Sequence, residues 1–211
     1  MKTKLFFALI AYLFLTTSCN EDKIKNTNAI VEEETKSEQV KPTREIIDIN
    51  QAKNEGFQIF DNENFIIKCP SKFKEDVVYY ETAKSQGMDV STIKSYVASE
   101  NTNSYEEGVI YNIVINDLSS FYDGFSKKEE LIFDEKFFDK YITDIKANNF
   151  KYKISKSNNK KCIHYNYSQA GLPTKAMLII DNKKSYMLQV ASRKNLDAKF
   201  EYLITNFKFI K

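Results

Sequence analysis

The residues best suited to chemistry are the single histidine and the cysteine two positions before it. His164 follows Cys162 in the stretch "KCIHYN", and a thiol beside an imidazole is the usual start of nucleophilic catalysis. Alternation along a strand puts both on one face, but about 6.6 Å apart at about 3.3 Å per residue. Proton transfer needs roughly 2.6–3.2 Å. We therefore expect a strand histidine without a catalytic role, with contact between His164 and Cys69 of a neighbouring strand as the alternative.

Other catalytic and metal-binding patterns are absent from the sequence. It has no C-x-x-C, H-E-x-x-H, G-x-S-x-G, P-loop or G-x-G-x-x-G pattern, and only 5 glycines. Glu135 and Asp139 are spaced to share a helix face, but Lys136 and Lys140 lie beside them, which is typical of a solvated surface. We expect no metal, no cofactor and no enzymatic activity.

The N-terminal residues have the pattern of a secretory leader. A short basic start with Lys2 and Lys4 precedes the uncharged apolar run "LFFALIAYLFL", which ends at Leu15. A helix of this length covers only about half of the roughly 30 Å hydrocarbon core of a bilayer. We expect cleavage rather than a permanent membrane span.

Small residues and a cysteine follow the apolar run. The stretch "TTSC" resembles the lipobox of bacterial lipoproteins, in which the cysteine, here Cys19, becomes the lipidated first residue; Thr16 stands where the commonest pattern has Leu. Several acyl chains, at about 0.8 kcal/mol per buried CH₂, form a stable anchor. Because Asn20 is not the aspartate that retains some lipoproteins at the inner membrane, we expect the outer membrane, with the acidic residues after Cys19 resembling a surface-export signal.

Charge and composition divide the rest of the chain into a tether and one domain. Loss of Lys2 and Lys4 takes the formal net charge from +2 to zero, which argues against nucleic acid as a partner. The residues after Cys19 are polar and carry no aromatic side chain up to position 45, as in a disordered tether. The predicted organisation is a leader at 1–18, a lipidated cysteine and linker at 19–46, and one domain at 47–211.

Alternating and helical periods predict an α+β domain. The expected strands are 57–60, 64–69, 77–82, 91–99, 109–116, 150–155, 161–167, 175–180 and 185–192. We expect 91–99 and 109–116 to form an antiparallel hairpin with a long loop, and the last four strands, joined by short polar turns, to form an antiparallel meander. Ser126 and Glu129 form a capping box for a long helix ending at 148–149, and Asn195 caps a closing helix. These elements give an antiparallel β-sheet packed with helices.

Two further features of this domain concern its side chains. In an oxidising envelope Cys69 and Cys162 are available for a disulfide, with buried free thiols as the alternative. Phe121 and Tyr122 lie in the polar loop before the long helix and are candidates for contact with a partner, while Phe125 is expected to pack back onto the helix near Glu130 or Leu131 as a hydrophobic staple.

The order of elements is similar to that of a known fold. The opening F-x-I-x-C-P at 65–70, the four-strand block from 151 to 192 and the ending "ITNFKFI" resemble the PsbP-like fold, an α/β/α sandwich also found in bacterial envelope lipoproteins with a PsbP-like or DcrB-like domain. Cysteines stand at positions 69 and 162, where proteins of this fold usually have other residue types. The resemblance implies a non-enzymatic module and gives no catalytic residues to carry over.

The sequence therefore favours a lipid-anchored protein of the bacterial cell envelope that binds a protein partner or a small ligand. A thiol- or His-dependent hydrolytic enzyme using Cys69, Cys162 or His164 is one alternative. An immunity or accessory lipoprotein that blocks a secreted effector is another. An enzyme predicts a pocket that contains His164 with a thiol or carboxylate in reach. A binding module predicts an exposed aromatic patch at Phe121 and Tyr122, with His164 outside any pocket.

Overall fold

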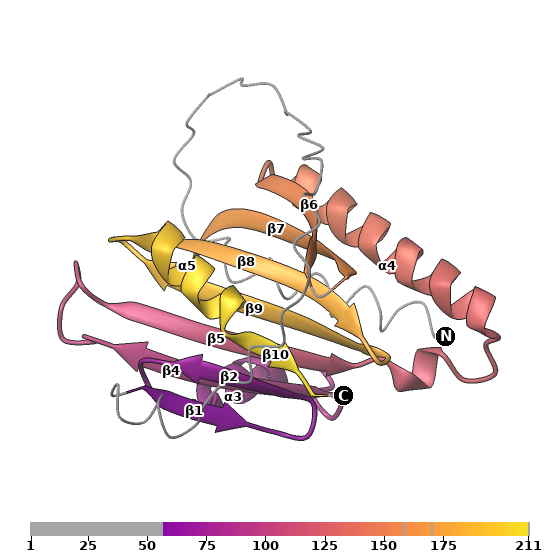
Figure 1. Ribbon diagram of the computed structural model, residues 1–211, viewed down its shortest axis with the longest axis horizontal. Coiled ribbons are helices and arrows are strands. Elements are labelled where there is room, and N and C mark those ends of the chain that lie inside the picture. Colours follow the sequence, from indigo (N-terminus) through magenta and orange to yellow (C-terminus); the bar gives the residue numbers. More distant parts are fainter. Residues whose placement is uncertain (1–56, 158, 170, 211) are drawn as a thin grey trace.

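A seven-stranded antiparallel sheet is the largest element of the computed structural model, which describes residues 57–157, 159–169 and 171–210 (Figure 1). In spatial order its strands are β3 (Lys74–Glu75), β4 (Ile93–Glu100), β5 (Val109–Asp117), β9 (Lys184–Ser192), β8 (Leu172–Asp181), β7 (Lys160–Gln169) and β6 (Lys151–Ser157). The expected hairpin of β4 and β5 and the meander of β6 to β9 are both confirmed.

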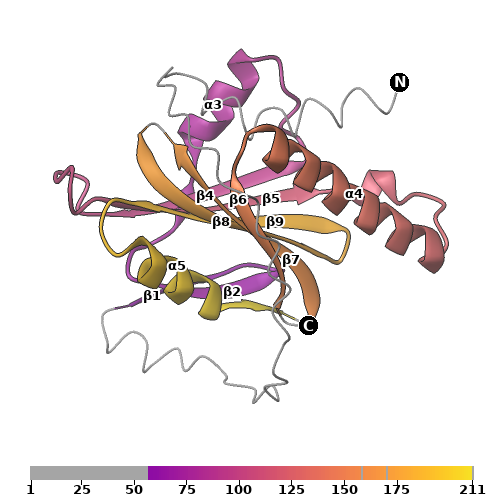
Figure 2. The same cartoon turned by 90° about the horizontal axis from the view of Figure 1, so that it is seen from above.

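One face of this sheet is covered by α4 (Lys127–Ala147). The helix begins at the predicted cap, where Ser126 Oγ accepts a hydrogen bond from the Glu129 N–H and the Glu129 carboxylate accepts one from the Ser126 N–H. Its inward side chains are Phe137, Phe138, Tyr141 and Ile145, which pack against Ile163, Leu178 and other apolar residues of the sheet. Figure 2 shows α4 and α3 on the same side of the sheet.

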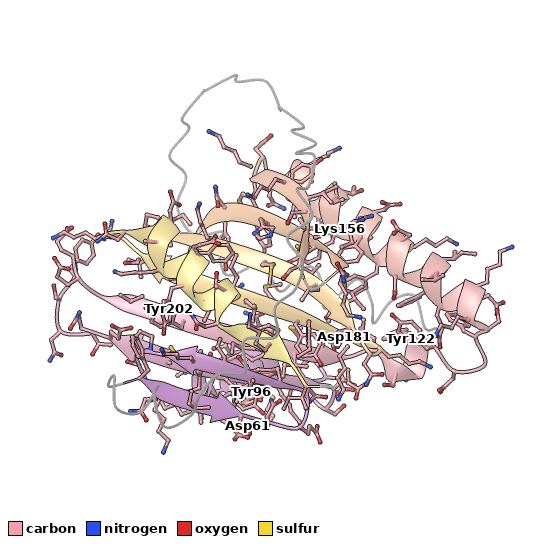
Figure 3. The ribbon with its side chains drawn as sticks, viewed as in Figure 1. Asp61, Tyr96, Tyr122, Lys156, Asp181 and Tyr202 are labelled. Carbon is pink, nitrogen blue, oxygen red and sulfur yellow. The ribbon has the colours of Figure 1, made fainter. Side chains whose placement is uncertain are left out.

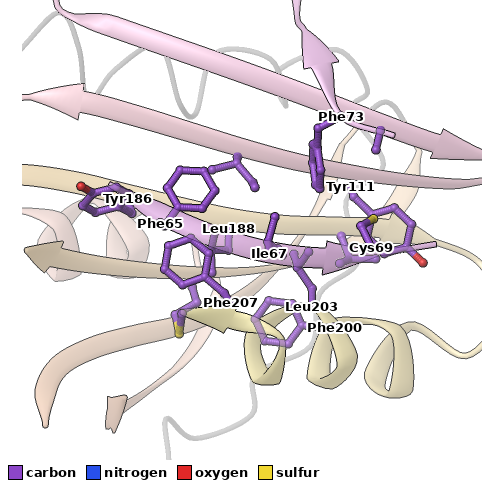
Figure 4. Close-up of a cluster of buried hydrophobic side chains, with 14 of the residues drawn as sticks. Phe65, Ile67, Cys69, Phe73, Tyr111, Tyr186, Leu188, Phe200, Leu203 and Phe207 are labelled. Carbon is purple, nitrogen blue, oxygen red and sulfur yellow. The ribbon is translucent and has the colours of Figure 1, made fainter. Parts of the chain in front are cut away.

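The opposite face carries a second, smaller sheet and α5 (Leu196–Thr205) (Figure 2). This sheet has the order β1 (Gln58–Asp61), β2 (Phe65–Cys69) and β10 (Phe207–Phe209). Phe65, Ile67, Leu203 and Phe207 are almost fully buried between it, the helix and the large sheet (Figure 4). The domain is thus an α+β structure with a core on each face of the large sheet, as the sequence predicted.

The strand expected at 77–82 is wrong, because these residues form α3 (Val77–Ser85). Asp76 caps the helix, and its Oδ1 accepts a hydrogen bond from the Tyr79 N–H at 3.0 Å. The helical period turns Val77 and Val78 outward, with exposed fractions of 58% and 71%, and turns Ala83 inward. A local cap and the inward packing of Tyr79 and Ala83 thus outweigh the strand preference of valine and tyrosine.

The C-terminal segment forms a strand that the sequence pattern did not reveal. Phe207, Lys208 and Phe209 pair antiparallel with β2, which lies well over a hundred positions earlier in the chain. Phe207 is 2% exposed, and its ring centroid lies 4.8 Å from that of Phe65. The end of the described chain therefore completes the small sheet and its core.

Candidate functional site

A groove runs along the side of α5 next to β6 and β7. The helix packs on β8 and β9, and beside it lie two cavities of about 600 Å³ and about 350 Å³. Both are lined by Lys153, His164 and Glu201, so they adjoin. We call this pair of cavities the α5 groove. The residues of its lining used below are Lys151, Lys156, Lys175, Asp197, Ala198, Phe200 and Lys208.

The floor of the α5 groove is set by the register of three strands. Lys153 on β6 lies opposite His164 on β7, which lies opposite Met177 on β8. Two residues along, Lys151 lies opposite Asn166, which lies opposite Lys175. Because alternate residues of a strand share a face, these side chains and that of Cys162 belong to the same face of the sheet.

Lysines outnumber carboxylates in the α5 groove. Its lining includes Lys151, Lys153, Lys156, Lys175 and Lys208 but only two carboxylates, Asp197 and Glu201. Lys175 forms an ion pair with Asp197. Among the described residues no ion pair joins the other four lysines to a carboxylate, and Lys156 projects from β6 (Figure 3). The groove therefore has an uncompensated positive charge.

His164 lies on the floor of the groove in its neutral form. Burial, with Lys153 and Lys175 nearby, lowers the pKa of the His164 imidazole from 6.5 to about 4. The ring meets Phe200 of α5 edge-on, with the centroids 5.8 Å apart. His164 therefore lies in a pocket with a thiol in reach, which was expected from the sequence for an enzyme and not for a binding module.

The structure also corrects the expected separation of His164 and Cys162. Cys162 Sγ lies 3.4 Å from His164 Nε2 and 3.1 Å from Ser155 Oγ. The estimate of about 6.6 Å describes the backbone, whereas side chains lean along the strand and close the gap. The Cys162 side chain is 0% exposed and burial raises the pKa of its thiol. The pair therefore stays neutral, without the thiolate that a nucleophile requires.

Cys69 and Cys162 are free thiols, so the structure does not contain the disulfide considered above. They lie on different sheets, Cys69 at the end of β2 and Cys162 on β7. Burial, with Glu100 nearby, raises the pKa of the Cys69 thiol to about 12. His164 thus contacts Cys162 on its own strand, and both thiols are protonated in the folded protein at neutral pH.

The aromatic loop before α4 is packed onto the helix rather than presented to a partner. Tyr122 is 3% exposed, and its hydroxyl donates a hydrogen bond to Asp134, two turns into α4 (Figure 3). Phe121 is half-buried and stacks on Phe133. Phe125 packs back onto the same helix, as expected, with its ring centroid 6.1 Å from that of Phe133. The predicted exposed patch is therefore wrong for Tyr122, and only part of Phe121 is accessible.

Several sequence predictions lie outside the described residues. These are the leader at 1–18, the lipidated Cys19, the linker at 19–46 and the first residues of the domain, 47–56. Within the part of the chain that the structure describes, His, Cys, Asp and Glu side chains form no group of three suited to a metal ion. In the same residues, no helix combines the length and the apolar character required to cross a bilayer.

The sequence predictions concerned the thiols, the histidine and one aromatic loop, and the lysines of the α5 groove were not among the predicted site residues. The signal was present in the alternation of "KYKIS", which puts Lys151 and Lys153 on one face. Together with the predicted pairing of strands 150–155 and 161–167, this alternation would have placed the two lysines across from His164 and Asn166. The sequence did not reveal the position of α5, and it is this helix that turns the lysine-bearing face of the sheet into a groove.

The comparisons with other proteins bear on the fold alone. No family model matches the chain, and no curated protein matches it. Among solved structures, the chain is similar to the solution structure of cyanobacterial PsbP (CyanoP) from Synechocystis sp. PCC 6803, with a TM-score of 0.39 and 8% sequence identity, over 73% of this chain and 92% of that chain. CyanoP is a PsbP protein, and a resemblance of the sequence to the PsbP-like fold was noted above. At such low identity, no residue role is transferred from it.

Proposed function

We propose that this protein is a non-enzymatic binding module of the bacterial cell envelope, anchored by lipid on Cys19, and that it takes its ligand in the α5 groove. The main support is the groove itself, because it combines two adjoining cavities with four lysines, Lys151, Lys153, Lys156 and Lys208, that form no ion pair with a carboxylate among the described residues. Cavities of about 300–1,000 Å³ are typical of sites for small ligands.

The chemistry of the groove favours binding over turnover. A thiol enzyme needs a thiolate that the substrate can reach, usually beside an imidazolium or another cation. Cys162 is fully buried with a raised pKa, and the pKa of His164 lies far below neutrality. The hydrolytic alternative would need both shifts to be reversed on substrate binding.

The envelope location is proposed from the sequence. The small residues before Cys19 resemble a lipobox, and the polar, aromatic-free residues after it have the composition of a tether. Acyl chains on Cys19 would hold the domain at the outer membrane. The test is metabolic labelling with a palmitate analogue in cells that express the wild type or Cys19→Ala. Equal label in the two proteins, or none in either, contradicts the anchor.

The binding role is tested by filling the groove. Ala198 is an exposed residue of α5 that lines the larger cavity, so Ala198→Trp should occupy it without disturbing the core. Full-length protein extracted from its own cells is compared by native mass spectrometry with Ala198→Trp and with Lys128→Trp, a control on exposed α4 surface. We expect a bound small molecule in the wild type and the control that is lost in Ala198→Trp. Equal occupancy in all three contradicts binding in the groove, and ester hydrolysis abolished by Cys162→Ala would establish an enzyme.

A further inference from the structure

We propose that the ligand of the α5 groove is a small amphipathic anion, whose acidic group is held among Lys151, Lys153 and Lys175 while its apolar part lies against Phe200. This inference rests on the proposed binding function and specifies its ligand class. The acidic group is a carboxylate or a phosphoryl group, since lysine binds either as a point charge.

The three lysines converge on one small area of the sheet. Lys151 and Lys175 lie on the same rung of the ladder with Asn166 between them, and Lys153 is opposite His164 on the next rung of that face. Adjacent strands lie about 4.8 Å apart, so the backbones of Lys151 and Lys175 are within about 10 Å. Flexible lysine side chains can therefore reach one anion placed above Asn166 and His164.

Protection of a sheet edge explains only part of this charge. Lysines on an edge strand prevent pairing with other chains, and Lys151 and Lys153 lie on β6, the last strand of the sheet. Lys175, however, lies on β8, which has β7 and β9 on its two sides. A lysine at such an interior position has no edge to protect. Its ion pair with Asp197 holds it beside the groove, and because the Asp197 side chain is 84% exposed, an incoming anion can replace or share that partner.

The remaining lining suits an apolar ligand body of limited size. Phe200 projects from α5 onto the ring of His164, and Ala198 lies two residues before it in the helix. The larger cavity measures about 600 Å³, enough for a small molecule with a short apolar chain. Asp197 and Glu201 lie on the α5 side of the groove, so the acidic group is expected on the side of the sheet.

His164 provides a direct readout of the charge in the groove. A bound anion favours the imidazolium, so occupancy should raise the pKa of His164 towards its ordinary value. The charged groups of the groove are Lys151, Lys153 and Lys156 on β6, Lys175 on β8, Asp197 and Glu201 on α5, and Lys208 on β10. Since His164 is the only histidine of the chain, its ring gives a single set of NMR signals.

The experiment uses three probes that share one apolar chain and differ in the head group. Full-length protein in an uncharged detergent, with labelled histidine, is titrated at constant ionic strength with hexanoate, hexyl phosphate or hexanol. We expect saturable shifts of the His164 signals and a raised His164 pKa with one or both anions, and a much weaker response to hexanol. The two anions distinguish a carboxylate ligand from a phosphoryl ligand. Lys153→Gln should weaken anion binding about tenfold through loss of a charge-assisted contact, whereas Lys128→Gln, with the same change of charge on α4, should not.

Three results would overturn the inference. The first is an unchanged His164 signal with both anions. The second is a response to hexanol as strong as that to hexanoate, which would make the groove an apolar site. The third is equal weakening by Lys153→Gln and Lys128→Gln, which would reflect net charge alone. If Ala198→Trp still removes a co-purified ligand in these cases, the binding function stands and only the anion class fails; if it removes none, both fail.

Discussion

Cys162 Sγ and His164 Nε2 lie 3.4 Å apart on the same face of β7, yet their surroundings keep both side chains neutral. Burial raises the pKa of the Cys162 thiol, and burial with two nearby lysines lowers the pKa of His164 to about 4. In a catalytic pair the imidazole takes the thiol proton and the resulting ions stabilise each other. Here the same contact is a hydrogen bond between neutral groups on the floor of the α5 groove.

The first prediction concerns the reactivity of Cys162. Because the thiol is buried and its pKa is raised, iodoacetamide should leave Cys162 unmodified in the native protein at neutral pH and modify it after unfolding in urea. Peptide mass spectrometry measures this, with Cys69, also buried, as the internal comparison. Rapid modification of Cys162 alone, slowed by His164→Ala, would instead reveal an activated thiolate.

A second prediction is a pH dependence of stability that originates at His164. Its pKa is about 4 in the folded protein against 6.5 ordinarily, so the unfolded chain binds more protons between these values. The free energy of unfolding therefore falls as pH decreases through this range, by at most about 3 kcal/mol from this group. Urea unfolding of the wild type and His164→Gln at several pH values measures the contribution as the difference between their slopes. Parallel pH profiles would mean that His164 titrates normally in the fold.

Much of the fold could be predicted because its signals are local. The capping box of Ser126 and Glu129 and the short turns of the meander each lie within a few residues of the elements they define. The pairing of β10 with β2 has no such local signal, since it depends on a contact between distant segments. The missed helix α3 and the Cys162–His164 contact depend on side-chain geometry, which alternation does not describe.

The core beneath the small sheet supplies a third prediction. Phe207 is 2% exposed and its ring packs on Phe65, Tyr186 and Phe209. Phe207→Ala should lower the free energy of unfolding by about 3–5 kcal/mol because a buried ring leaves a cavity. Phe125→Ala is the control, since Phe125 is 39% exposed, and should cost about 1 kcal/mol or less. Midpoints of urea unfolding at an unchanged slope give both values. Similar costs for the two variants would show that β10 adds little to the core.

The cap of α3 carries a fourth prediction. Asp76 accepts a hydrogen bond from the Tyr79 N–H and another from Asn112 Nδ2 at 3.1 Å, so it joins the helix to β5. Asp76→Ala should lower the free energy of unfolding by about 1–2 kcal/mol, and Asp76→Asn, which keeps an acceptor for the N–H, by less. Asp123→Ala at an exposed loop position is the control. Equal stability of Asp76→Ala and Asp123→Ala would argue against α3 as a capped helix.

The last prediction uses the ion pair at the mouth of the α5 groove. Asp197 pairs with Lys175, and its own side chain is 84% exposed, so it competes with an incoming anion while adding little to stability. Asp197→Asn should therefore bind hexanoate or hexyl phosphate several-fold more tightly than the wild type, whereas Lys175→Gln should bind it more weakly. The His164 NMR titration measures both affinities. Opposite changes from the two halves of one ion pair would not follow from a loss of folding, which weakens binding in either variant. If Asp197→Asn binds the anion no better than the wild type, Lys175 does not contact the acidic group, and the anion must lie elsewhere in the groove.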